Sequence, residues 1–100
     1  MPIVLQKFRV VVNAGQGKVK FDEVEGSEIK NEYGLDLFVH KSPTGQYKVS
    51  EMTTGCSLTK ACPLKRDAVN ELHEVVKQYG VDAIKKKIQE REKEIKQKLL

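Results

Sequence analysis

Two cysteines and two histidines are the side chains of this sequence best suited to bind a metal or to take part in catalysis. Five residues separate Cys56 from Cys62, while His40 and His73 lie far from them and from each other. Zinc sites in small domains use shorter spacings within each pair of ligands. We therefore predict no metal site and no cofactor. We expect both cysteines to be free thiols, as in proteins of the reducing cytosol.

Nucleophilic catalysis needs a cysteine or serine beside a base, and a third group that orients the base. Only folding could bring Cys56 next to either histidine, and no local pattern supports such a pair. The glutamates between positions 23 and 32 lie in a polar segment, which offers no buried pair of carboxylates for acid–base chemistry. The prediction is that the protein is not an enzyme and has no catalytic residue.

A G-x-G motif, Gly15-Gln16-Gly17, follows the first apolar segment. A phosphate-binding loop of this type runs into a helix, whose N-terminus binds the phosphate. Here the motif is followed by residues 18–24, which alternate in polarity like a strand and are rich in lysine. The motif therefore indicates a hairpin turn.

Basic residues give the chain a formal net charge of +4, from 18 lysines and arginines against 14 acidic residues. The two signs are interleaved, which is typical of a solvated mixed-charge surface. Short basic clusters nevertheless provide what phosphate binding requires. They are Lys7, Arg9, Lys18 and Lys20 in the first hairpin, Lys60, Lys65 and Arg66 near the start of the first helix, and Lys85, Lys86 and Lys87 in the second helix.

The first half of the chain has the apolar–polar alternation of β-strands. We predict a polar loop over residues 25–34, and strands over residues 3–12, 18–24, 35–41 and 46–52. Ser42-Pro43-Thr44-Gly45 has the composition of a tight turn. If this turn pairs Lys41 with Gln46, Phe38 is paired with Val49. Both faces of the hairpin carry apolar residues, so the pattern leaves open which face is buried.

The second half has the 3.6-residue period of helices, beginning at Lys65 after a crossover loop. Gly80 ends the first helix, and Asp82 lies near the start of the second. The first apolar stripe contains Val69, Leu72, Val75, Val76 and Tyr79, and the second contains Val81, Ile84, Ile88, Ile95 and Leu99.

Together these elements predict one α+β domain over residues 1–100. An antiparallel sheet of about four strands occupies residues 1–54, and two C-terminal helices in residues 63–100 pack on one face of it. The second helix is about as long as a small domain is wide. We therefore expect its distal end to protrude, with Ile95 and Leu99 covered by another surface. The core is expected to contain Val10, Phe21, Val69, Leu72 and Val76.

Residues 37–55 and the run Lys65-Arg-Asp-Ala-Val resemble small phage and mobile-element proteins, which combine a β-hairpin, a Thr-Gly strand end and a following helix. Those proteins are mostly of unknown function, and some are inhibitors that bind host defence enzymes. A second likeness is to double-stranded RNA-binding domains, which also run three strands into a helix with a basic start. This chain lacks their leading helix.

These observations predict a small, non-enzymatic binding module of the cytoplasm. The chain has no secretion signal and no apolar run long enough to span a membrane. The expected partner is a protein, or a second copy, bound through the C-terminal helix at Ile95 and Leu99. The alternative is a nucleic acid bound by Lys65, Arg66, Lys85, Lys86 and Lys87.

Overall fold

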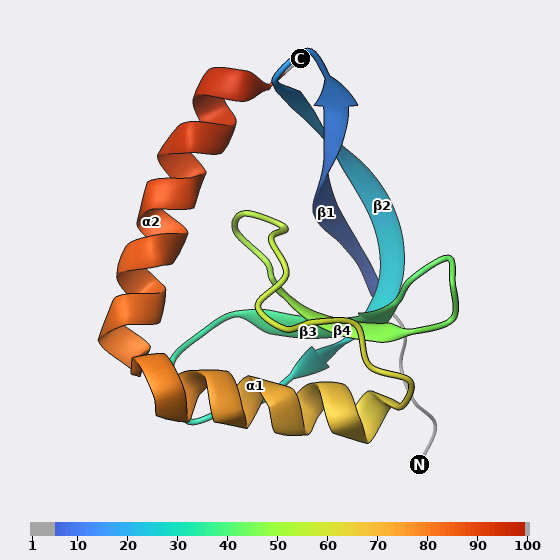
Figure 1. Ribbon diagram of the computed structural model, residues 1–100, viewed down its shortest axis with the longest axis vertical. Helices are drawn as coiled ribbons and strands as arrows, with labels where there is room; N and C mark the ends of the chain where they lie inside the picture. The colour runs from blue at the N-terminus through green and yellow to red at the C-terminus, as the bar shows by residue number, and fades with distance from the viewer. Residues whose placement is uncertain (1–5, 100) are drawn as a thin grey trace.

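The computed structural model describes residues 6–99 and places four strands before two helices (Figure 1). Strands β1 (Gln6–Gly15), β2 (Lys18–Ile29), β3 (Leu37–Lys41) and β4 (Tyr47–Glu51) form one antiparallel sheet in chain order. Helices α1 (Lys65–Tyr79) and α2 (Val81–Lys98) follow, and neither is long and apolar enough to cross a membrane. The predicted α+β class, with the sheet ahead of both helices, is confirmed.

The β1–β2 hairpin is longer than the alternation pattern predicts. Gly15 pairs with Lys18 around a two-residue turn, in which Gln16 and Gly17 both have positive φ, as a type I′ turn requires. The G-x-G motif is thus a hairpin turn, as predicted. β2 continues through the first part of the predicted loop, because its last residues pair with β3 from Gly26 onward. The predicted strand start at residues 3–5 lies outside the described residues.

The β3–β4 register differs by one residue from the prediction. Lys41 pairs with Tyr47, and Phe38 pairs with Ser50 instead of Val49. The cause is the turn: the Ser42 N–H donates to the Gln46 carbonyl at 2.6 Å, which leaves a three-residue loop over residues 43–45 instead of the predicted four-residue loop over 42–45. Within it, the Gly45 N–H donates to the Ser42 carbonyl at 2.9 Å, with Gly45 at φ +85°. This register puts Leu37, Val39 and Val49 on one face of the sheet.

Helix α1 covers that face and forms the core with it. Leu37, Val39 and Val49 are buried against the α1 side chains of Ala68, Leu72 and Val76, together with Leu35, Cys62 and Ile84. Leu72 and Val76 are therefore core residues, as predicted. Val10, Phe21 and Val69 are half-buried and lie outside this cluster. Val10 and Phe21 are outside it because α1 packs on the short strands β3 and β4, whereas the β1–β2 hairpin curves away from it (Figure 1). Val69 is outside it because α1 turns Ala68, Leu72 and Val76 toward the sheet.

The sheet is strongly curved, and on its opposite face β1 bends toward β3. The ring of Phe8 in β1 stacks on that of Phe38 in β3, with centroids 4.3 Å apart. The loop after β4 closes the curl, since the Val11 N–H donates to the Gly55 carbonyl at 3.0 Å. A Cβ on Gly55 would lie only 2.7 Å from the Arg9 carbonyl oxygen, so this approach requires glycine.

Helix α2 runs from the end of α1 to the turn of the β1–β2 hairpin (Figure 1). Leu99, directly after the helix, forms a parallel bridge with Val19 of β2. Ile95 is 8% exposed, and Leu99 is 40% exposed. The expectation that the distal end protrudes and that Ile95 needs a foreign surface is therefore wrong. The long hairpin reaches the end of the helix and supplies that surface within the chain.

Candidate functional site

A single residue, Gly80, joins the two helices at a sharp elbow. Its N–H donates to the Val76 carbonyl at 2.8 Å, and its own carbonyl accepts from the Ile84 N–H at 3.2 Å. Val76 and Ile84 are both buried in the core, one on each side of the junction. The elbow is therefore anchored, and it sets the end of α1 beside the first half of α2.

The loop of residues 54–58 lies opposite the elbow and is held by the buried side chain of Glu51. The Glu51 carboxylate accepts hydrogen bonds from the Thr53 N–H at 2.6 Å, the Thr54 N–H at 2.8 Å and the Thr54 hydroxyl at 2.9 Å. Further along, the Leu58 N–H donates to the Val49 carbonyl at 2.7 Å. These bonds give the loop a defined shape before any ligand arrives.

A cavity of about 390 Å³, which we call the elbow cleft, lies between this loop and the two helices. Its volume is within the range of small ligand-binding pockets. Tyr79, at the end of α1, is 62% exposed at this cleft. Most of the lining surface is apolar, and the charged side chains among the described lining residues are both cations. The lining consists of Thr54, Cys56, Ser57, Leu58, Val75, Tyr79, Ala83, Ile84, Lys87, Ile88 and Arg91.

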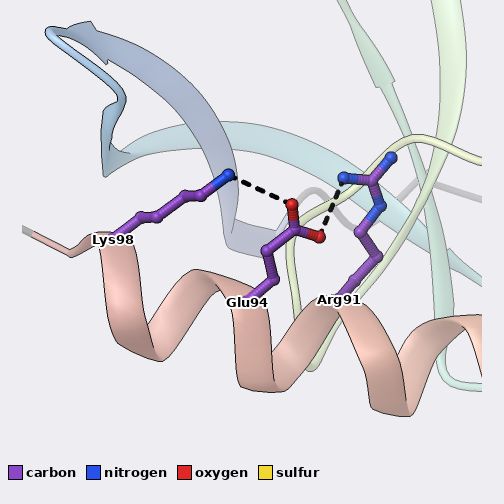
Figure 2. A network of polar contacts seen from close by, with 3 residues as sticks. All are labelled: Arg91, Glu94 and Lys98. Atoms are coloured by element: carbon purple, nitrogen blue, oxygen red, sulfur yellow. Dashed lines mark hydrogen bonds and ion pairs between the residues drawn. The ribbon is translucent and has the colours of Figure 1, made fainter.

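Arg91 belongs to a charged network on α2 (Figure 2). Its Nη1 donates to Glu94 Oε2 at 3.2 Å, while Lys98 Nζ donates to Glu94 Oε1 at 3.1 Å. The hydrogen bond from Lys98, with the charges of Lys98 and Arg91, holds the pKa of the Glu94 carboxyl below its ordinary value. Lys87, one turn before Arg91, has no ion pair within the described part of the chain.

A second, more polar cavity of about 740 Å³ adjoins the elbow cleft on the curled face of the sheet. The two cavities share Cys56, Ser57 and Arg91. In its floor, His40 Nε2 and Ser50 Oγ lie 2.9 Å apart. Burial, and secondarily the charge of Lys48, lowers the pKa of the His40 imidazole.

The His40–Ser50 pair lacks two features of a catalytic serine and its base. Ser50 is 1% exposed, so its hydroxyl is not accessible to a substrate. His40 Nδ1 has no hydrogen-bond partner among the described residues, whereas a catalytic triad needs a group on that nitrogen to orient the ring. The pair therefore does not supply an activated nucleophile.

Of the four residues considered as metal ligands, His40 and Cys56 line the same polar cavity, whereas Cys62 and His73 lie elsewhere. No three histidine, cysteine or acidic side chains among residues 6–99 are grouped so that they could hold a metal ion. His73 instead lies against Tyr33, whose hydroxyl is 2.6 Å from His73 Nδ1. Cys62 is a buried core thiol, and Cys56 is a half-buried free thiol between the two cavities.

The basic clusters considered for nucleic-acid binding are also separated. Lys65 and Arg66 lie at the start of α1, and Lys85, Lys86 and Lys87 lie beyond its other end. The thirteen residues of α1 that follow Arg66 alone span roughly 20 Å along the axis. Of these five predicted contacts, Lys87 lines the elbow cleft.

Sequence reasoning missed most of the elbow cleft. Val75, Tyr79 and Ile88 belong to the two predicted apolar stripes, and helical spacing does not indicate that they line a cleft. A tyrosine directly before the glycine that ends a helix was a usable sign of exposure. No sequence pattern indicated that Leu58, Ala83 and Arg91 belong to one site, because the amino-acid sequence does not show which segments the elbow brings together.

Comparisons with protein-family models, curated proteins and solved structures find no match to this chain. The site is therefore interpreted from its own geometry and chemistry.

Proposed function

We propose that this protein is a non-enzymatic binding module of the cytoplasm, which captures a protein partner in the elbow cleft. The observation that carries the proposal is an open, largely apolar cavity with fixed walls and an exposed tyrosine at its rim. Protein interfaces concentrate their binding energy where an apolar side chain of one partner fills a preformed pocket of the other. An inhibitor of a host enzyme, as among the mobile-element proteins that the chain resembles, is one form of such a module.

The elbow cleft suits a protein better than a nucleic acid. Single-stranded nucleic acids bind by stacking successive bases on several aromatic rings along a basic groove. Tyr79 is the sole aromatic residue among the described residues that line the cleft. The separation of the basic clusters likewise argues against one continuous phosphate-binding surface.

Filling the cleft tests this proposal. Ala83 is an exposed helical residue of the lining, so Ala83→Arg blocks the cavity while keeping a good helix former. Gln89→Arg is the matched control, because it adds the same side chain at an exposed α2 position outside the lining. We expect Ala83→Arg to lose the partner that the wild type and Gln89→Arg capture from a host lysate, with an unchanged circular dichroism spectrum.

The nucleic-acid alternative is tested with the same preparations in a gel mobility shift at low and raised salt. Our proposal predicts that replacing Lys85, Lys86 and Lys87 by Glu leaves any shift unchanged. A salt-sensitive shift that disappears in this variant, combined with unimpaired protein capture by Ala83→Arg, would replace a protein partner by a nucleic acid.

A further inference from the structure

The charges around the elbow cleft have one sign. Lys87 and Arg91 are the charged residues of its described lining, and neither faces a carboxylate from across the cleft. Glu94 is bonded to Arg91 from the same helix and to Lys98, so it neutralises only part of this charge. A guanidinium has five N–H donors. The single hydrogen bond to Glu94 therefore leaves Arg91 able to bind a second carboxylate.

The adjoining cavity carries charges of both signs. It adds Lys41 and Lys48 as well as Asp22 and Glu23. Glu23 is already engaged, because its Oε1 lies 3.4 Å from Lys7 Nζ. The excess of positive charge is therefore at the elbow cleft itself, on Lys87 and Arg91.

A second copy of this protein is a poor occupant of the cleft. The large apolar side chains that the described residues expose are Leu64, Tyr79 and Leu99. Each lies within two residues of a lysine in the sequence, namely Lys65, Lys77 and Lys98 respectively. Inserting any of them into a partner copy would bring one cation against another, which disfavours the complex.

Building on the proposed function, we infer that the occupant is an acidic segment of a foreign protein. It inserts one large apolar side chain between Leu58 and Ile88, and its flanking carboxylates pair with Lys87 and Arg91. The apolar contact supplies most of the affinity. The charge pairs set the choice of partner and speed association, and they weaken as salt is added.

Random linear peptides displayed on phage provide a defined probe. The library is selected on the wild-type protein and counter-selected on Ala83→Arg, so that peptides bound elsewhere are removed. We expect the survivors to share one Leu, Ile, Phe or Trp flanked by Asp or Glu. A consensus peptide is then synthesised, and its affinity is measured by fluorescence polarisation for the wild type, Lys87→Glu and Lys93→Glu.

We expect Lys87→Glu to weaken the peptide about tenfold, because an attractive contact becomes repulsive. Lys93→Glu is the matched control: it makes the same charge change on an exposed α2 residue outside the lining, and we expect an effect within about twofold. Replacing the apolar residue of the peptide by Ala should abolish binding.

The outcomes separate this inference from the proposed function. The selected peptides, which bind the wild type but not Ala83→Arg, could be neutral or basic, or could bind Lys87→Glu as tightly as the wild type. Either result would overturn the acidic partner and leave the cleft as a protein-binding site. Failure to enrich any Ala83-dependent peptide would overturn both, as would Ala83-dependent binding of an oligonucleotide in place of peptides.

Discussion

His40 makes the stability of this protein sensitive to mild acid. Its imidazole is buried next to Ser50 and near Lys48, so the folded protein favours the neutral ring and its pKa is lowered. The unfolded chain protonates His40 at the ordinary value of about 6.5. As the pH falls below that value, the unfolded state takes up a proton that the folded state does not. The free energy of unfolding therefore decreases until the pH passes the lowered pKa of the folded protein.

His40→Gln should remove this share of the pH dependence, because an amide can still hydrogen-bond Ser50 but does not titrate. Urea unfolding of the variant and the wild type, above and below about pH 6.5, measures it. His73→Gln is the control, because His73 is exposed. If His40→Gln and the wild type lose equal stability on acidification, the assignment to His40 is contradicted.

Leu72 is a fully buried residue at the centre of the α1 interface with the sheet. Leu72→Ala should lower the free energy of unfolding by about 2–5 kcal/mol, because it leaves a cavity in a close-packed core. Leu64→Ala removes the same atoms from a half-exposed position and should cost about 1 kcal/mol or less. Equal losses in urea unfolding would show that α1 does not pack as described.

The core residues of α1 could be predicted only in part from the sequence. Leu72 and Val76 follow from the helical period, and both are buried. The same period gave equal weight to Val69, which is half-buried, and none to Ala68, which is fully buried. The rotation of a helix about its axis depends on the sheet beneath it. A small side chain such as Ala68 allows the helix to lie closest to the sheet, but it adds little to the apolar periodicity of the sequence.

At the scale of elements, the closure of the curled sheet depends on Gly55. Gly55 and Gly34 both have positive φ, but only at Gly55 would a Cβ meet main-chain atoms, those of Arg9, Val10 and Val11. Gly34→Ala should lower the free energy of unfolding by about 1–2 kcal/mol, which is the cost of placing a residue with a Cβ at positive φ. Gly55→Ala should cost clearly more in thermal or urea unfolding, since β1 must also move. Similar losses for both variants would contradict the close approach of the loop to β1.

The elements themselves were largely predictable, whereas their pairing was not. Alternation and turn composition located both hairpins, and period and glycine located both helices. The end of β2 was missed because residues 26–28 are polar or glycine, and the sequence does not show that they pair with the buried strand β3. The β3–β4 register was missed because Gly45 can close either a three-residue or a four-residue loop, and only main-chain geometry distinguishes them.

For the whole molecule, the contact between α2 and the β1–β2 hairpin replaces the partner surface expected from the sequence. Ile95→Ser should lower the free energy of unfolding by about 2–5 kcal/mol, because Ile95 is buried within the chain. Leu99→Ser should have a smaller effect, and neither variant should change the oligomeric state in analytical ultracentrifugation. An Ile95→Ser protein with unchanged stability that dissociates into smaller species would restore the helix end as a self-association surface.

The elbow cleft is a property of the whole molecule, and this is why no local pattern predicted it. Its walls come from the loop of residues 54–58, the end of α1 and the first half of α2. Gly80 and the Glu51 hydrogen bonds bring them together. None of these segments carries a binding signature by itself, so the cleft becomes visible only in the folded protein.

The most direct test of the central claim is methyl NMR of the protein with its captured partner. If the partner binds in the elbow cleft, the methyl resonances of Leu58, Val75, Ala83 and Ile88 should shift or broaden, and those of Leu64, at the other end of α1, should stay in place. Shifts at Leu64, beside Lys65 and Arg66, with unchanged cleft methyls would contradict the claim and would place binding at the basic start of α1.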